Sequence, residues 1–320
     1  MRYPAPFAPP GVEIPRLDFG NGSRATPQIG GKLVYFLGAF GNLTAAELET
    51  GSIAWQTDLY GEFEVRERSK WGLCCSPLLI DDMVIVGPGG DAGGIVALDA
   101  TTGKVRWKSK TNGAGHSSFH AATLGGKKQI IGYDAISLGG WDLQSGRRLW
   151  TLVPPKKSDF NVGTPVVVGE NLFVATENNG SRLYRFHKDG TIDPTPIGKH
   201  AELAPDSHTP VAVGSRIFGV WNNLYCLDAG NQLKELWQLE DSAFLVYTAV
   251  ICSPTRVAAL TQHAEFFLLD ANANKPTVLS RCVLFENEKG VYSHPAFVGN
   301  RLYMRNSSAI VCFDLSEPAK

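Results

Sequence analysis

The chain has 320 residues, of which 43% are hydrophobic, and its 30 basic and 31 acidic residues leave a net charge of −1. Because the two signs are balanced along the chain, nothing favours nucleic acid or an anionic membrane as a partner. The longest apolar runs are strand-sized, so the sequence predicts no membrane span. The proline-rich residues 1–19 lack the apolar core of a signal peptide, and none is expected in this chain.

A repeat of roughly 43 residues runs along the chain. It is clearest in "AAELETGSIAW" (45–55), "ALDATTGKVRW" (97–107) and "GWDLQSGRRLW" (140–150), and "CLDAGNQLKELW" (226–237) is a looser copy. An acidic residue marks the same place in these and in two partial copies: Glu47, Asp99, Asp142, Asp228, Asp270 and Asp314. The spacing requires one further unit between Asp142 and Asp228, and the alignment puts His187 in its acidic place.

A second landmark precedes each copy and is followed by a turn and an apolar strand. In chain order its forms are "RATPQI", "CCSPLL", "HAATL", "GTPVVV", "HTPVAV", "YTAVI" and "SHPAFV". Glycine, asparagine and aspartate mark the turns, and β-branched or aromatic residues fill the strands, so each unit predicts four strands. Seven such units predict an all-β protein, a seven-bladed β-propeller of four-stranded antiparallel blades.

The repeat boundaries follow from these landmarks. The units are expected near residues 24–59, 74–111, 115–155, 161–200, 206–241, 245–285 and 292–317. The last unit ends without a fourth strand, whereas residues 11–19, which precede the first unit, have strand character. We expect residues 11–19 to supply that strand and close the ring, which removes the exposed sheet edges. Residues 1–320 would then form a single domain.

Each repeated residue has an expected mechanical role. The aspartate should accept backbone N–H groups of a tight turn. The glycine after it should allow a positive φ. The tryptophan should lie on the outermost strand and cover the seam between blades with its large ring.

The motif "ALDATTGKVRW", together with its upstream Ser-Pro landmark, resembles the PQQ-like β-propeller repeat family over residues 24–317. That family includes quinoprotein alcohol dehydrogenases, the propeller lipoprotein of outer-membrane protein assembly, and exported bacterial proteins. The sequence is most similar in style to the exported group. The resemblance therefore implies a bacterial, exported protein with a periplasmic or other extracytoplasmic location. The repeat itself builds blades and does not carry cofactor chemistry.

Residues at the start of each inner strand should form a ring at one mouth of the central channel. Three readings of this ring stay open. The side chains fill the channel together with trapped water. Histidines from different blades hold a divalent metal ion, with candidate ligands His120, His208 and His294. A small molecule or peptide binds in the funnel, with candidate contacts Arg24, Trp71, Tyr247 and Tyr292.

The adjacent Cys74 and Cys75 head one inner strand. In quinoprotein alcohol dehydrogenases such a pair can form a disulfide ring against the quinone, so the resemblance makes these residues candidates for binding PQQ with calcium. No acidic and amide set for the calcium ion can be assigned from the sequence, and buried cysteine is ordinary. A structural role is therefore favoured, and no cofactor is expected.

The insertion 60–71, "YGEFEVRERSKW", is the longest excursion in the repeat and should project over one face as a partner-binding surface. The sequence thus predicts a monomeric, non-catalytic binding or scaffolding module that uses the funnel mouth and this insertion for a protein or glycan partner. The alternative is an enzyme at the channel axis, either a metal-dependent carbohydrate-active enzyme or a PQQ-dependent oxidoreductase.

Overall fold

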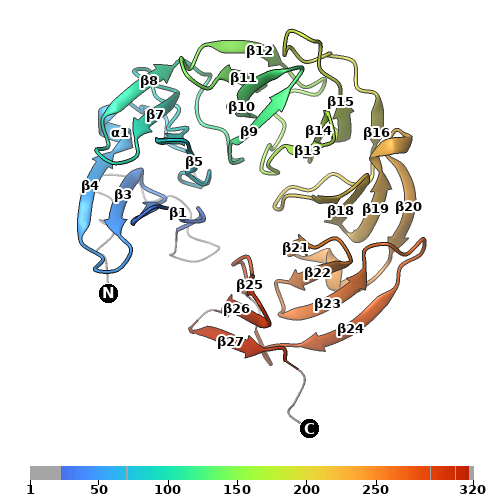
Figure 1. Cartoon of the computed structure of the whole chain (residues 1–320). Coiled ribbons are helices and arrows are strands. Elements are labelled where there is room, and N and C mark those ends of the chain that lie inside the picture. The colour runs from blue at the N-terminus through green and yellow to red at the C-terminus, as the bar shows by residue number, and fades with distance from the viewer. Residues whose placement is uncertain (1–22, 70, 289, 307, 317–320) are drawn as a thin grey trace.

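The computed structural model of this protein describes residues 23–69, 71–288, 290–306 and 308–316. Within them the chain forms seven antiparallel sheets that stand around a central axis like the blades of a propeller (Figure 1). In each sheet the strands follow one another in sequence order from the axis outward. The predicted all-β, seven-bladed propeller is therefore confirmed.

The first four blades have four strands each. Blade 1 consists of β1 (Gln28–Gly30), β2 (Leu33–Leu37), β3 (Asn42–Glu47) and β4 (Ile53–Asp58). Blade 2 consists of β5 (Leu78–Ile80), β6 (Met83–Val86), β7 (Ile95–Asp99) and β8 (Val105–Ser109). Blade 3 consists of β9 (His120–Leu124), β10 (Lys127–Tyr133), β11 (Leu138–Asp142) and β12 (Arg148–Leu152). Blade 4 consists of β13 (Val166–Val168), β14 (Asn171–Thr176), β15 (Gly180–Tyr184) and β16 (Gly198–His200).

The remaining blades complete the ring. Blade 5 consists of β17 (Val211–Val213), β18 (Arg216–Trp221), β19 (Asn223–Asp228) and β20 (Lys234–Leu239). Blade 6 consists of β21 (Thr248–Cys252), β22 (Arg256–Thr261), β23 (Glu265–Asp270) and β24 (Val278–Val283). Blade 7 has three strands in the described part of the chain: β25 (Ala296–Val298), β26 (Arg301–Arg305) and β27 (Ile310–Asp314).

Helical turns are short and lie in the connections: α1 (Leu59–Glu62), η1 (Ala229–Asn231) and η2 (Ser242–Leu245). None of the helices in the described residues is long and apolar enough to cross a membrane.

The repeated aspartate closes a turn between the third and fourth strands, as predicted. Asp99 Oδ1 accepts hydrogen bonds from the backbone N–H groups of Thr101 (3.1 Å) and Thr102 (2.8 Å). The Thr102 hydroxyl also donates to Asp99 Oδ1, at 2.8 Å, and this bond, followed by the Thr102 N–H and Arg106, lowers the pKa of Asp99 to about 2. Gly103 completes the turn with a positive φ of 70°.

At three seams the repeated tryptophan bonds the turn of the following blade, whereas Trp150 bonds Gln129 within blade 3. Trp55 of blade 1 donates its Nε1–H to the carbonyl oxygen of Ala100 in the blade 2 turn, at 2.9 Å. A Cβ on Gly103 would lie 2.7 Å from the Trp55 ring, so glycine is also needed there for close approach. Trp107 bonds the carbonyl of Leu143 in blade 3 in the same way. The prediction that tryptophan covers the seams is confirmed at these positions.

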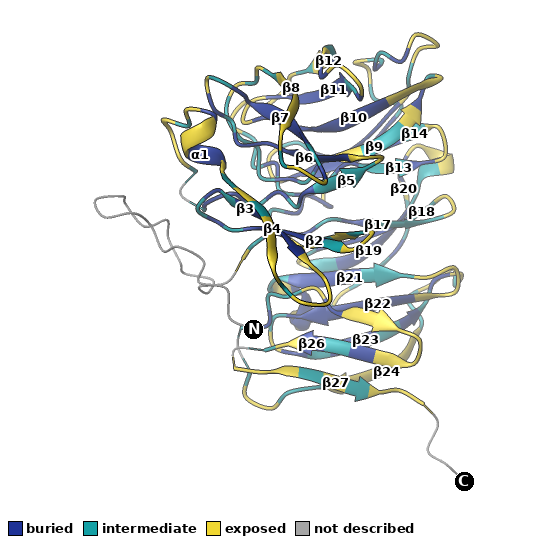
Figure 2. Cartoon of the chain, turned by 60° about the vertical axis from the view of Figure 1, so that its left-hand side comes forward, coloured by how far each residue is buried: buried dark blue, intermediate teal, exposed yellow. Residues whose placement is uncertain are grey.

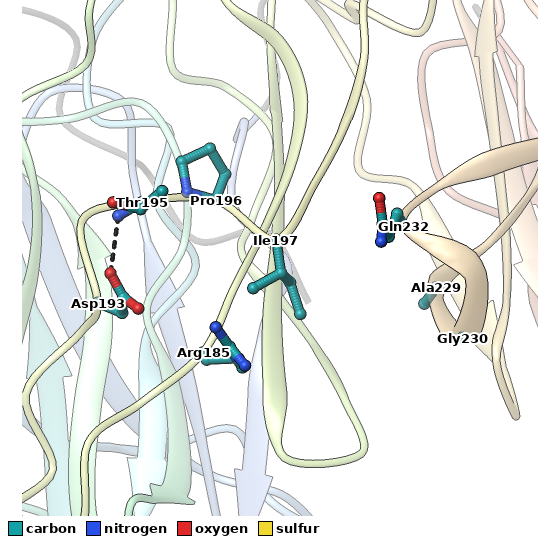
Figure 3. A pocket seen from close by; sticks show the side chains of 8 residues that line it. All are labelled: Arg185, Asp193, Thr195, Pro196, Ile197, Ala229, Gly230 and Gln232. Carbon is teal, nitrogen blue, oxygen red and sulfur yellow. Dashed lines mark hydrogen bonds between the residues drawn. The ribbon is translucent and has the colours of Figure 1, made fainter.

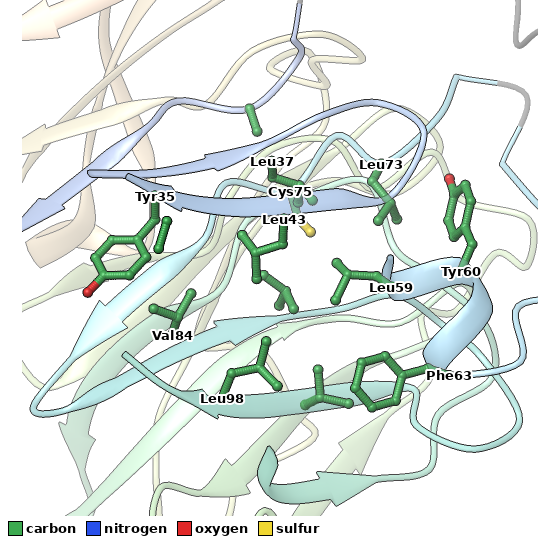
Figure 4. Packing of buried hydrophobic residues seen from close by; sticks show 14 of the residues in the cluster. Tyr35, Leu37, Leu43, Leu59, Tyr60, Phe63, Leu73, Cys75, Val84 and Leu98 are labelled. Carbon is green, nitrogen blue, oxygen red and sulfur yellow. The ribbon is translucent and has the colours of Figure 1, made fainter. Parts of the chain in front are cut away.

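The hydrophobic core is divided among the seams between neighbouring blades. At the first seam, Tyr35, Leu37 and Leu43 of blade 1 pack against Val84 and Leu98 of blade 2 (Figure 4). Comparable clusters join the later blades in turn up to blades 6 and 7. Each fully buried aliphatic side chain contributes roughly 1.5–3 kcal/mol, so the ring is stabilised seam by seam.

The junction of blade 7 with blade 1 is less covered among the described residues. Ile310 of β27 is 77% exposed, Val298 of β25 is 63% exposed and Ile29 of β1 is 61% exposed. Figure 2 shows the exposed ends of β27 beside the outer strand β24. The predicted closing strand, residues 11–19, lies outside the described residues, so ring closure by that segment stays a prediction.

Candidate functional site

The predicted binding residues lie on one face of the ring. Because neighbouring strands run antiparallel, each outer strand ends on the face where the next inner strand begins. The segments 59–77, 110–119, 153–165, 201–210, 240–247 and 284–295 make these connections. We call the face that carries them the channel face. The aspartate turns lie on the opposite face.

The Ser-Pro and Thr-Pro landmarks tie neighbouring blades together around the channel. The backbone N–H of Thr26 donates to Ser76 Oγ at 2.9 Å, and the N–H of Ser76 donates to Ser118 Oγ at 2.9 Å. The N–H of Ser118 in turn donates to Thr164 Oγ1 (3.3 Å), and the N–H of Thr164 donates to Thr209 Oγ1 (3.0 Å). We call these bonded residues of blades 1 to 5 the hydroxyl girdle.

The hydrogen bonds of the girdle show that the sequence alignment of blade 3 is wrong by three residues. In blades 6 and 7 the equivalent residues differ from this pattern. Ser118 stands where the alignment had Ala121, so His120 is not in the ring of residues just before the landmark; it lies in β9, opposite Ile131 of β10. In blade 6 the Thr248 hydroxyl donates instead to the carbonyl of Val246, at 3.1 Å. In blade 7 His294 takes the position that serine or threonine has elsewhere.

The candidate metal ligand His208 has a structural role. It is 5% exposed, and its Nε2 accepts the backbone N–H of Val220 at 2.8 Å. Burial, with a smaller repulsion from the nearby His294, lowers the pKa of His208 to about 3. Burial also lowers the pKa of His294. Both imidazoles are therefore neutral at physiological pH.

The three candidate histidines do not form a metal-binding group. Across the described segments, no three His, Cys, Asp or Glu side chains come together in a way suited to a metal ion. Because Nε2 of the neutral His208 ring already accepts a hydrogen bond, Nδ1 carries the ring proton and has no lone pair for a metal ion.

Cys74 and Cys75 are free thiols in this structure. Cys75 is 1% exposed and belongs to the core cluster between blades 1 and 2, and burial raises its pKa. The Cys74 thiol contacts the carbonyl oxygens of Trp71 and Gly72 at 3.7 and 3.6 Å. Burial, opposed by the charge of Arg24, raises the pKa of Cys74 to about 11. Both thiols are protonated at neutral pH, which makes them poor nucleophiles and poor metal ligands.

The four candidate funnel residues lie as two pairs. Arg24 donates its Nε–H to the carbonyl of Trp71 at 2.9 Å, which joins blade 1 to the entry of blade 2. The rings of Tyr247 and Tyr292, from the entries of blades 6 and 7, lie 5.9 Å apart at 47°. Burial raises the pKa of Tyr247 to about 12, so its hydroxyl stays protonated.

The insertion 60–71 is a built structure, which we call the lip. It begins at Asp58, whose carboxylate caps α1 by accepting the N–H of Tyr60 at 3.1 Å. Leu59, Tyr60 and Phe63 are buried and pack into the seam between blades 1 and 2 (Figure 4). The lip therefore uses its apolar side chains as anchors.

Backbone bonds fix the middle of the lip to the β6–β7 hairpin of blade 2. The N–H groups of Asp91 and Ala92 donate to the carbonyls of Glu64 (3.4 Å) and Phe63 (3.2 Å). Arg66 pairs with Asp91 at 3.0 Å. The charged residues of the lip are exposed, namely Glu62, Glu64, Arg66, Glu67 and Arg68, and the Arg68 guanidinium lies 4.8 Å from the centre of the Tyr60 ring. The described residues 60–69 thus form an anchored, charged surface on the channel face.

A hollow on the opposite face was not predicted. It lies between blades 4 and 5, opens to solvent and has a volume of about 440 Å³ (Figure 3). Its lining residues are Arg185, Asp193, Thr195, Pro196, Ile197, Ala229, Gly230 and Gln232. The available signal was the unusual length of the segment between the third and fourth strands of blade 4.

The sequence matches the family model described as "Outer membrane protein assembly factor BamB" over residues 7–239, which is more than half of the chain. The chain belongs to this family. Its BamB-type repeat is the PQQ-like repeat, so the resemblance stated from the motif is confirmed. A comparison with curated proteins found no match.

Solved structures share the BamB-family fold. BamB from Moraxella catarrhalis superposes with a TM-score of 0.65 at 17% identity, covering 88% of this chain and 81% of that one. The quinohemoprotein alcohol dehydrogenase ADHIIG from Pseudomonas putida HK5 has a TM-score of 0.60 at 12% identity, covering 87% of this chain and 61% of that one. The computationally designed Ika8 protein has a TM-score of 0.51 at 10% identity, covering 92% and 97%. Such low identities show a common fold and nothing further.

The quinohemoprotein relative raises the question of whether this channel mouth suits PQQ. The residues described here do not fit it. Cys74 and Cys75 are buried, protonated thiols, and the girdle hydroxyls already serve as acceptors between blades. In the same part of the chain no acidic group offers a calcium ion three side-chain ligands.

Proposed function

We propose that this BamB-family chain is a monomeric, non-catalytic propeller that binds a protein partner on its channel face. The observation that carries the proposal is the lip. A blade needs no such insertion for its own packing, yet this one is anchored by buried residues and backbone bonds and presents its charges to solvent. A rigid surface of this kind loses little conformational freedom when a partner binds.

The neighbouring mouth residues suit a protein interface. Tyrosine, tryptophan and arginine dominate the binding energy of many interfaces, and Arg24, Trp71, Tyr247 and Tyr292 are of these types. The family's namesake is an outer membrane protein assembly factor. By that analogy we infer that the partner is a component of outer-membrane assembly and that the chain works in an extracytoplasmic compartment.

Site-specific cross-linking in the source cell tests the proposal. A photoreactive amino acid at Glu67, on the lip, should give a cross-link to one protein. The same group at Gln144, in an exposed turn on the opposite face, is the matched control and should give none. Purified partner should then bind the unmodified chain, and Arg66→Glu/Arg68→Glu should weaken binding at least about tenfold.

Two results would contradict the proposal. Equal cross-linking at Glu67 and Gln144, or none at either, would remove the lip as a protein-binding surface and would leave a glycan partner to be tested. The enzymatic alternative predicts about one equivalent of calcium or a transition metal in natively purified protein. Transition metal that is lost on His208→Ala would favour a metalloenzyme, and calcium that is retained would favour a quinoprotein.

A further inference from the structure

Blade 4 reverses the charge of the repeat at one position. In the other blades for which the register is directly comparable, an acidic residue pairs with the first residue of the second strand: Leu33 with Glu47, Met83 with Asp99, Arg216 with Asp228, Arg256 with Asp270, and Arg301 with Asp314. In blade 4, Leu172 pairs with Tyr184. The next pair in this register sets Asn171, the first residue of β14, opposite Arg185. By this continued register Arg185 takes the place of the acid, whereas His187, two residues later, makes the backbone bonds of the turn with Gly190 and Thr191.

The turn that the acid normally closes is rebuilt by other residues. Asp189 accepts the N–H of Thr191 (2.9 Å) and its hydroxyl (2.7 Å) at the tip of a longer hairpin. Asp193 Oδ1 then accepts the N–H of Thr195 at 2.9 Å. The connection runs over residues 185–197 before β16 begins. Arg185 is exposed, and no hydrogen bond or ion pair from the described residues engages its guanidinium. The backbone carbonyl of Arg185 accepts the Asp193 N–H at 2.9 Å, but its side chain makes no bond that holds the turn among the described residues.

The guanidinium borders the hollow between blades 4 and 5. Arg185, Asp193, Thr195 and Ile197 form one wall, and Gln232 with the η1 turn forms the other (Figure 3). The two walls are in close contact at their base, because a Cβ on Gly198 would come within 2.5 Å of the Gln232 backbone. A volume of about 440 Å³ is in the range of small-ligand sites.

We propose that this hollow, the blade 4–5 pocket, binds a carboxylate that has an N–H donor beside it. The planar fork of Arg185 would hold the carboxylate with two parallel hydrogen bonds. Asp193 Oδ2 and the Gln232 amide would accept the N–H group. An acidic side chain on a peptide and a free amino acid share this chemistry. The site lies on the face opposite the lip and does not depend on the proposed partner of the channel face.

Calorimetric titration of the full chain tests the pocket. The probes are acetyl-Gly-Glu-Gly-amide, its glutamine counterpart, and free glutamate. The glutamate peptide or free glutamate should saturate the protein, and the glutamine peptide should bind at least about tenfold more weakly because it lacks the charge. Saturation by the peptide alone indicates a polypeptide source, and saturation by free glutamate indicates a small molecule.

Substitutions of Arg185 test whether its side chain binds the carboxylate. Arg185→Gln should weaken binding at least about tenfold, and Arg185→Lys should recover part of it, since lysine keeps the charge but loses the fork. Arg147→Gln, in the exposed turn of blade 3, is the matched control and should bind like the parent. Unchanged binding by Arg185→Gln, equal binding of the glutamine peptide, or no saturation by any probe up to ~20 mM would overturn the proposal.

Discussion

At the scale of single residues, the channel is held by neutral groups placed where each supplies one hydrogen bond. One of them is the buried His208, whose Nε2 accepts the Val220 N–H and whose pKa is about 3. The girdle hydroxyls act in the same way between blades. The polar groups at the channel mouth hold the backbone in position. Protonation of these groups therefore changes the stability of the fold.

His208 makes stability depend on pH. Its pKa lies near 6.5 in the unfolded chain and about 3 in the folded one. Between these values the unfolded chain binds the additional proton, so the free energy of unfolding falls as pH decreases from about 6.5, by up to about 1.4 kcal/mol per pH unit. Urea unfolding from pH 7 to pH 4.5 measures this slope.

His208→Gln keeps a neutral acceptor for the Val220 N–H. It should reduce the change of unfolding free energy with pH by the amount that corresponds to close to one proton. The depressed carboxyl pKa values, such as that of Asp99 at about 2, act mainly below this window and are common to both proteins. An unchanged slope in the variant would show that His208 does not titrate on unfolding.

At the scale of elements, the repeat predicted most of the blade from local chemistry. Residues equivalent to Asp99, Gly103 and Trp107 recur at fixed spacing. The aspartate and glycine form the same turn in successive blades, and the tryptophan packs at the seam between blades. The sequence could not fix positions where a blade departs from the repeat. In blade 3 the landmark lacks proline, so the sequence alignment put Ala121 in the girdle position. The structure shows that Ser118 holds it. In blade 4 the predicted His187 makes the backbone bonds of the turn, but the continued strand register sets Arg185 opposite Asn171, because the turn lies two residues further along the chain.

Phe63 anchors the lip through both its side chain and its backbone. Phe63 is buried in the seam, and its carbonyl accepts the Ala92 N–H. Phe63→Ala should cost about 3 kcal/mol or more of unfolding free energy and release the lip, so trypsin should cleave after Arg66 and Arg68 much faster. Limited proteolysis under native conditions measures this. Glu67→Ala, which removes only an exposed side chain, is the control, and equal cleavage of both variants would show that the lip is not anchored by Phe63.

At the scale of the whole molecule, closure of the ring is the prediction with the largest effect. Residues 11–19 are expected to pair with β27, next to the exposed Ile310. Deleting residues 1–22 should therefore lower the thermal midpoint by more than about 5 °C. Val12→Asp/Ile14→Asp should reproduce the loss. Deleting only residues 1–9 is the control and should not, and if the two deletions behave alike the closing strand lies elsewhere.

The girdle also places one reporter amide at each of the four junctions from blade 1 to blade 5. The N–H groups of Thr26, Ser76, Ser118 and Thr164 are each bonded to the blade that follows. Deuterium therefore replaces each proton only when that one junction opens. The exchange rates of these amides would order the junctions by their opening free energies, and a partner seated on the lip would slow the Thr26 amide, at the junction of blades 1 and 2, before the others.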